Sequence, residues 1–258
     1  MYIDGISSLK GVRIMSQVII GSTLSALSTG LGALIILFMH RSIAHRWRDL
    51  LLAFSAGIMM AASTMGLIPE ALKYGDFLQL TIGIFLGVFT LTLLEKNIPH
   101  MDLHHSQMGI EFDKKAMLII AAITLHNIPE GLSVGVSYAS QSHHETGNLI
   151  ALAIGFQNAP EGFLVALFLV NQKITKVKAF IVSTLTGVIE IVTSLIGFYL
   201  TSLVDNLVSY GLAFAAGAML FIIYKELIPE SHGDGNERTS TYSFIVGLLF
   251  MVLLIDLF

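Results

Sequence analysis

The sequence predicts an all-α integral membrane protein with eight transmembrane helices arranged as a 3+2+3 inverted repeat. Three observations carry this prediction: the hydrophobic composition, the number of long apolar stretches and a repeated Pro-Glu motif. Of the 258 residues, 54% are hydrophobic and 12% are charged, and the mean hydropathy is +0.78. Because an average soluble domain is about 25% charged, this composition argues against a soluble enzyme.

The apolar stretches define the expected helices in chain order. A helix that spans a bilayer needs about 20 mostly apolar residues. Stretches of this kind occupy residues 14–39, 49–72, 77–95, 116–138, 148–170, 176–204, 207–230 and 241–257. We therefore expect a single transmembrane domain over residues 1–258, with one sizeable loop at 96–115 that carries histidines.

The basic residues indicate the orientation of the chain. The loops after the first, third and fifth stretches carry nine of them: Arg41, Arg46, Arg48, Lys96, Lys114, Lys115, Lys173, Lys176 and Lys178. Cytoplasmic loops are enriched in Lys and Arg, so we expect these loops in the cytoplasm and both chain ends outside the cell membrane. No Lys/Arg run forms a nucleic-acid-binding surface, and the absence of cysteine excludes disulfides and thiolate ligands.

Four of the five prolines are followed by glutamate, and these pairs belong to two duplicated motifs. Residues 54–59 and 67–70 match residues 214–219 and 227–230 in the same register. Residues 126–131 (HNIPEG) match 157–162 (QNAPEG). Five crossings separate the second stretch from the seventh, so these copies run in opposite directions. Inverted repeats around a site at the bilayer midplane are typical of transporters.

The fourth and fifth stretches carry the polar groups with the clearest chemistry. These are His126, Asn127 and Glu130 in one motif and Gln157, Asn158 and Glu161 in the other. Residues four apart lie on one face of a helix. Ionised carboxylates within a bilayer are costly and mark functional sites, and two that face each other favour a cation between them. Imidazole, carboxylate and carboxamide groups together suit a divalent transition metal.

The prolines of these two motifs shape the backbone around the polar groups. Pro129 and Pro160 cannot donate to the carbonyl groups of Leu125 and Phe156. We expect a kink and a freed carbonyl oxygen in each helix. The alternative is that His126 is a packing residue and that the glutamates are protonated groups joining two helices.

Other polar residues inside the stretches have more than one interpretation. Glu190, in the sixth stretch, suits a ligand or a protonated structural group equally well. Met59 and Met219 occupy matched positions in the repeat, where methionine is more often a packing residue than a ligand. We expect Glu226 to form an ion pair with the adjacent Lys225.

The two motifs resemble those of the ZIP metal-transporter family, and Gln157 in place of a second histidine resembles its GufA-like branch. The resemblance covers the whole chain and implies a ZIP-like helical bundle. It also implies import of a divalent metal into the cytosol, chiefly Zn²⁺ and in some members Cd²⁺, Fe²⁺ or Mn²⁺. Members are thought to transport metal by sliding one helix bundle against another, which is a form of alternating access.

The resemblance further implies a ligand set for one or two metal ions. One ion would bind His126, Gln157, Glu130, Glu161 and Met59, and a second would bind Asn127, Asn158, Glu190 and the same two bridging glutamates. Some members carry aspartate where this chain has Asn158. Since one negative charge is missing, the second ion should bind more weakly here.

Three other functions remain as alternatives at this stage. An intramembrane metalloprotease needs a catalytic metal with a water and a general base, commonly as H-E-x-x-H, which the sequence lacks. A structural or receptor-like membrane protein would bind no metal in these helices. A metal-selective channel cannot be distinguished from a carrier by sequence. The oligomeric state is also left open, with a homodimer as one arrangement.

Overall fold

The computed structural model describes residues 2–39, 45–97, 112–140, 144–204, 207–233 and 235–257, and this part of the chain is helical without a strand. Its elements are α1 (Tyr2–Phe38), α2 (His45–Ala61), the π-helix η1 (Ala62–Leu67), α3 (Ile68–Tyr74), α4 (Phe77–Asn97), α5 (Phe112–Ala139), α6 (His144–Asn171), α7 (Lys176–Leu203), α8 (Leu207–Ile222), the π-helix η2 (Ile223–Leu227), α9 (Ile228–Ser231) and α10 (Glu237–Leu257).

The prediction of an all-helical membrane bundle is confirmed. Seven helical stretches of the described chain are long and apolar enough to cross a membrane, and α5 adds a further helix of 28 residues. Three loop histidines, His100, His104 and His105, lie outside the described residues.

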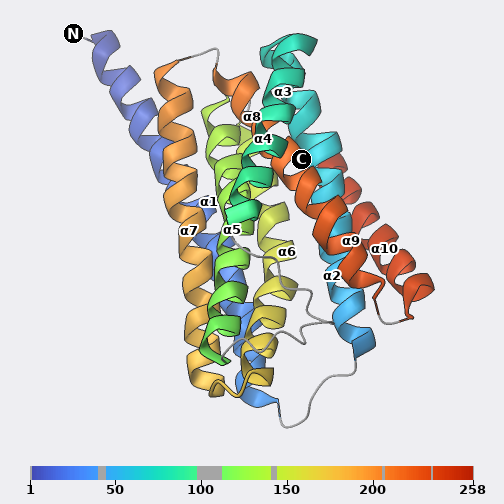
Figure 1. Cartoon of the computed structure of the whole chain (residues 1–258). Coiled ribbons are helices and arrows are strands. Elements are labelled where there is room, and N and C mark those ends of the chain that lie inside the picture. The colour runs from blue at the N-terminus through green and yellow to red at the C-terminus, as the bar shows by residue number, and fades with distance from the viewer. Residues whose placement is uncertain are drawn as a thin grey trace.

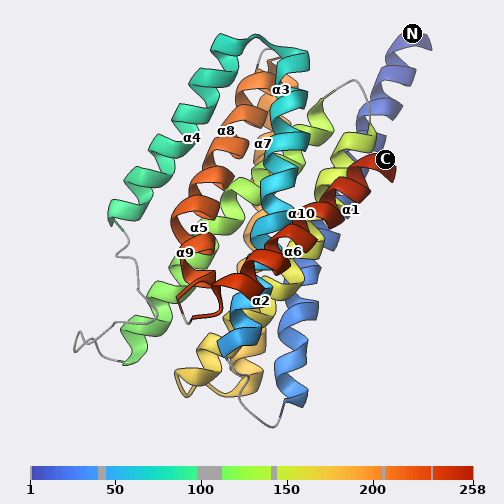
Figure 2. The same ribbon diagram turned by 90° about the vertical axis from the view of Figure 1, so that its right-hand side faces the viewer.

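The helices group into two bundles. The first contains α1, α5, α6 and α7, and the second contains α2 with α3, α4, α8 with α9, and α10. Figure 1 shows α1 and α7 at the left and α2 and α10 at the right, and Figure 2 shows α4 beside α8. The bundles meet where α5 contacts α8 and where α2 contacts α6.

Glycines bring the helices into backbone contact inside each bundle. A Cβ atom at Gly162 in α6 would overlap the carbonyl oxygen of Thr29 in α1, and one at Gly57 in α2 would overlap that of Phe244 in α10. Small residues allow this approach, which replaces the hydrophobic driving force that is missing in lipid. At Gly211, where α8 faces α5 of the other bundle, a Cβ atom would instead meet the Val136 side chain at 3.1 Å.

The duplicated Leu-Ile-Pro-Glu segments fold alike. A π-helix ends at the leucine of each: the Ile68 N–H bonds to the carbonyl of Ser63, and the Ile228 N–H bonds to that of Ile223. These wide turns are typical of functional sites. By contrast, α5 and α6 remain α-helical through Pro129 and Pro160.

Candidate metal site

Unpartnered oxygen atoms gather between α5 and α6 in the first bundle. Glu130 is fully buried, and Gln157 Nε2 donates to its Oε1 atom at 2.5 Å. Glu130 Oε2, Gln157 Oε1 and Glu161 Oε1 are buried and accept no hydrogen bond from the described residues. A buried polar atom without a partner costs about 1–3 kcal/mol. Acceptors that converge from two helices in this way suit a cation.

A second group of polar atoms adjoins the first and includes Glu190 of α7. Asn158 Nδ2 donates to both carboxylate oxygens of Glu190, at 2.8 and 2.9 Å, while Asn158 Oδ1 accepts from Gln157 Nε2 at 2.9 Å. Ser25 Oγ of α1 donates to Glu190 Oε2 at 2.7 Å. Hydrogen bonds therefore link the α5 and α6 motifs to both α1 and α7.

Ser25 is a site residue that sequence reasoning missed. It is 1% exposed, and it lies in an apolar helix that contains several serines and threonines of similar appearance. Its contacts with Glu190 and Asn158 distinguish it from them, and the sequence carried no signal strong enough to select it.

The three glutamates lie close enough together for their charges to interact. The Glu130 carboxylate interacts electrostatically with those of Glu161 and Glu190. In an apolar environment this repulsion is larger than in water, because the dielectric constant is low. A divalent cation among the carboxylates would relieve it.

His126 lies near enough to Glu161 for their charges to interact, and it also contacts the other bundle. Its Nε2 atom lies 2.7 Å from Glu226 Oε2, in η2. The prediction that Glu226 pairs with Lys225 is wrong, because Lys225 forms an ion pair with Glu95 of α4. Neighbouring residues on a helix do not face each other, so packing gives the two side chains different partners.

Asn127 and Met59 contact groups other than these carboxylates. Asn127 Nδ2 donates to the carbonyl oxygen of Thr186 at 2.8 Å. Met59 is 2% exposed and belongs to an apolar cluster that also contains its repeat partner, Met219. Within the described part of the chain, no three His, Asp or Glu side chains are grouped closely enough to hold a metal ion without movement. The donors brought together here are carboxylates and carboxamides.

Comparisons with known proteins identify the family of this chain. A family model described as "ZIP Zinc transporter" matches residues 94–255. Zinc transporter GufA of Myxococcus xanthus is 34% identical over 93% of this chain and 98% of that protein. Zinc transporter ZIPB of Bordetella bronchiseptica is 32% identical over 92% of the chain and 79% of that protein. Zinc transporter ZupT of Streptococcus mutans is 30% identical over 92% and 96%. The chain is thus a member of the ZIP zinc transporter family, as its paired Pro-Glu motifs predicted.

Proposed function

We propose that this protein imports a divalent transition metal, chiefly zinc, into the cytosol by alternating access through the site between α5 and α6. The observation that carries the proposal is the set of three unpartnered acceptor oxygens beside the carboxylates of Glu130, Glu161 and Glu190, of which the first and the third are fully buried. The names of the relatives, which are zinc transporters, support zinc as the substrate.

The proposed ligands form two positions that share Glu130 and Glu161. The first adds His126, Gln157 and Met59, and the second adds Asn127, Asn158 and Glu190. To coordinate zinc, His126 must leave Glu226, and Asn158 must turn its oxygen toward the ion, since its NH₂ group now faces Glu190. A carboxamide can bind a cation only through oxygen.

The two bundles provide the moving parts. The first bundle carries all the proposed ligands except Met59, and its helices are joined by close backbone contacts. At Gly66 and Gly211 the groups that face each glycine across the border between the bundles are side chains, and such contacts can exchange partners as one bundle slides. We infer that the loops after α1, α4 and α6 are cytoplasmic and that both ends lie outside. In this orientation the α8–α9 stretch ends on the cytoplasmic side. The contact between His126 and Glu226, near that end, therefore lies toward the cytoplasm.

Reconstitution of the purified protein in lipid vesicles tests the proposal. Vesicles that contain the protein should accumulate zinc at a rate that saturates with zinc concentration, and empty vesicles should not. A rate that rises linearly without saturation would favour a metal-selective channel. Absence of uptake in vesicles that contain folded protein would refute transport. Competition with Cd²⁺, Mn²⁺ and Fe²⁺ would rank the substrates.

The substitution Asn158→Asp is expected to strengthen the second position. The NH₂ group that now donates to Glu190 is replaced by a carboxylate oxygen. Added ligand charge raises cation affinity. At limiting free zinc, bound metal should rise from about one ion per chain toward about two, measured by mass spectrometry of the purified protein. Asn171→Asp, at the exposed end of α6, is the control and should leave the ratio unchanged. Equal zinc content in the Asn158→Asp and native proteins would contradict this role for Asn158.

A further inference from the structure

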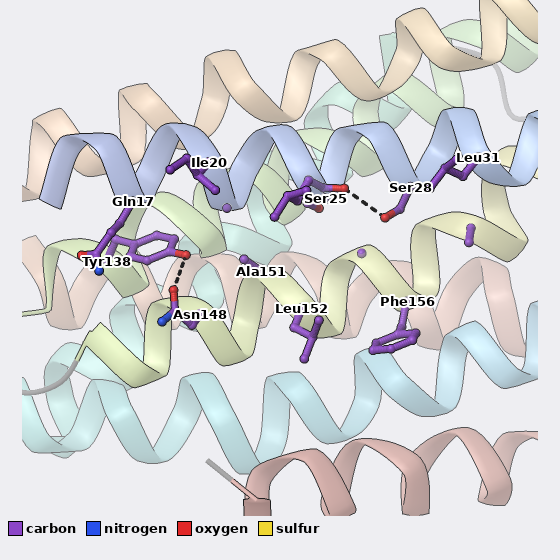
Figure 3. A pocket seen from close by; sticks show the side chains of 14 residues that line it. Gln17, Ile20, Ser25, Ser28, Leu31, Tyr138, Asn148, Ala151, Leu152 and Phe156 are labelled. Carbon is purple, nitrogen blue, oxygen red and sulfur yellow. Dashed lines mark hydrogen bonds between the residues drawn. The ribbon is translucent and has the colours of Figure 1, made fainter. Parts of the chain in front are cut away.

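A groove of about 600 Å³ runs between α1 and α6, beside the proposed metal site (Figure 3). Its floor consists of small residues on both helices, namely Gly21, Ser25, Ser28, Ala151, Gly155 and Ala159. Large apolar side chains border it, among them Leu24, Leu31 and Phe156, and all three are exposed on the surface of the protein. The groove therefore opens to the surroundings of the helices, which in a membrane are lipid chains.

The groove passes the middle of the bilayer, and one of its ends lies near the lipid head groups. The apolar stretch of α1 runs from Arg13 to Phe38, so Ser25 lies close to its middle. Gln17 is eight residues nearer the start of the helix, which is about 12 Å at 1.5 Å per residue. Half of the hydrocarbon core is about 15 Å thick. Gln17 thus lies near the boundary between acyl chains and head groups.

Three polar side chains gather at this end of the groove: Gln17, Tyr138 and Asn148 (Figure 3). The Tyr138 hydroxyl donates to Asn148 Oδ1 at 2.8 Å. Gln17 Oε1 is buried and accepts no hydrogen bond from the described residues. Buried acceptors in proteins are almost always paired, so this oxygen is available to a donor from outside the described residues.

One cation and one anion flank the polar end. Arg13 lies one turn before Gln17 on the same face of α1, and Glu145 lies three residues before Asn148 in the first turn of α6. Both are exposed. Since α1 and α6 run in the same direction through the bundle, these two charges lie at the same end of the groove. They match a head group that carries both a negative and a positive charge.

We propose that the groove binds one phosphatidylethanolamine molecule. Its acyl chain lies along the small residues of α1 and α6, its phosphate faces Arg13, and its ammonium group donates to Gln17 Oε1 near Glu145. Phosphatidylcholine carries the same charges but has no N–H donor. Phosphatidylglycerol has hydroxyl donors but no positive charge for Glu145.

The bound chain would also close the lipid side of the metal site. Ser25 forms part of the groove floor and donates to Glu190 through its hydroxyl group. An acyl chain over Ser25 keeps water from reaching Glu190 from the bilayer side. The lipid thereby contributes to the apolar environment of the carboxylates.

Native mass spectrometry of the full chain, mixed with equal amounts of the three phospholipids, tests the proposal without measuring transport. We expect phosphatidylethanolamine to be retained roughly tenfold over phosphatidylcholine, which corresponds to about 1.4 kcal/mol. Gln17→Leu should abolish this preference. Leu24→Trp should fill the groove and lower the retention of all three lipids, whereas Ile19→Trp, at an exposed position that does not line the groove, should not.

The outcomes decide the proposal in either direction. Equal retention of phosphatidylethanolamine and phosphatidylcholine, or a preference for phosphatidylglycerol, overturns the assigned head group. A preference that survives Gln17→Leu overturns the role of that side chain. If Ile19→Trp lowers retention as much as Leu24→Trp, the lipid binds elsewhere. Because the Leu24→Trp measurement does not depend on Gln17, the location is tested even if Gln17→Leu fails to fold.

Discussion

Zinc uptake by the Glu161→Ala variant is expected to fall by roughly a hundredfold or more, although the protein should still reach the membrane. Loss of a supporting residue around a metal site commonly costs 10–100-fold, and Glu161 is proposed as a direct ligand of both ions. Its Oε1 atom is one of the unpartnered acceptors of the site. Uptake of labelled zinc into vesicles, normalised to the amount of protein inserted, measures the loss.

The chain provides a matched control for this substitution. Glu70 also follows a proline and is 3% exposed, but it belongs to the second bundle and pairs with Lys73 at 2.7 Å. Glu70→Ala should retain most of the uptake. Normal uptake by Glu161→Ala would refute the assignment of the site, and an equal loss in both variants would point to general damage to the membrane fold.

A disulfide between the bundles is expected to stop transport. Val136 of α5 and Gly211 of α8 face each other across the border, where a Cβ atom on Gly211 would lie 3.1 Å from Val136 Cγ1. Cysteines at both positions place their Cβ atoms near the roughly 3.5–4.5 Å that a disulfide requires. Because the chain has no native cysteine, the introduced pair has no competing partner. Oxidation should reduce zinc uptake to background, and a reducing agent should restore it.

The control pair shares one of the two positions. Gly197 of α7 lies in the same bundle as Val136, and a Cβ atom there would be 3.3 Å from Val136 Cγ2. Oxidation of the Val136→Cys/Gly197→Cys variant should leave uptake intact, because it joins helices that move together. Full transport by the oxidised Val136→Cys/Gly211→Cys variant would contradict sliding of the bundles.

Much of the architecture could be predicted from the sequence. In lipid, every backbone polar group must be paired within its own segment, so long apolar stretches have no alternative to the helix. The positions of His126 and Glu130, and of Gln157 and Glu161, on shared helix faces followed from their spacing of four residues. The repeat was visible because its two copies keep Leu-Ile-Pro-Glu, and in both copies a π-helix ends at the leucine of that segment.

The partners of the polar side chains could not be predicted in the same way. The sequence determined eight apolar segments, their order and the polar residues they carry. The tertiary structure decided that Glu226 meets His126 while Lys225 meets Glu95, and that Ser25 supports Glu190. Helix formation depends on bonds between residues a few positions apart, whereas these contacts join residues that are 100 or more positions apart. They exist only once the helices have packed into two bundles, because packing sets the rotation of each helix and therefore the neighbour that each side chain meets.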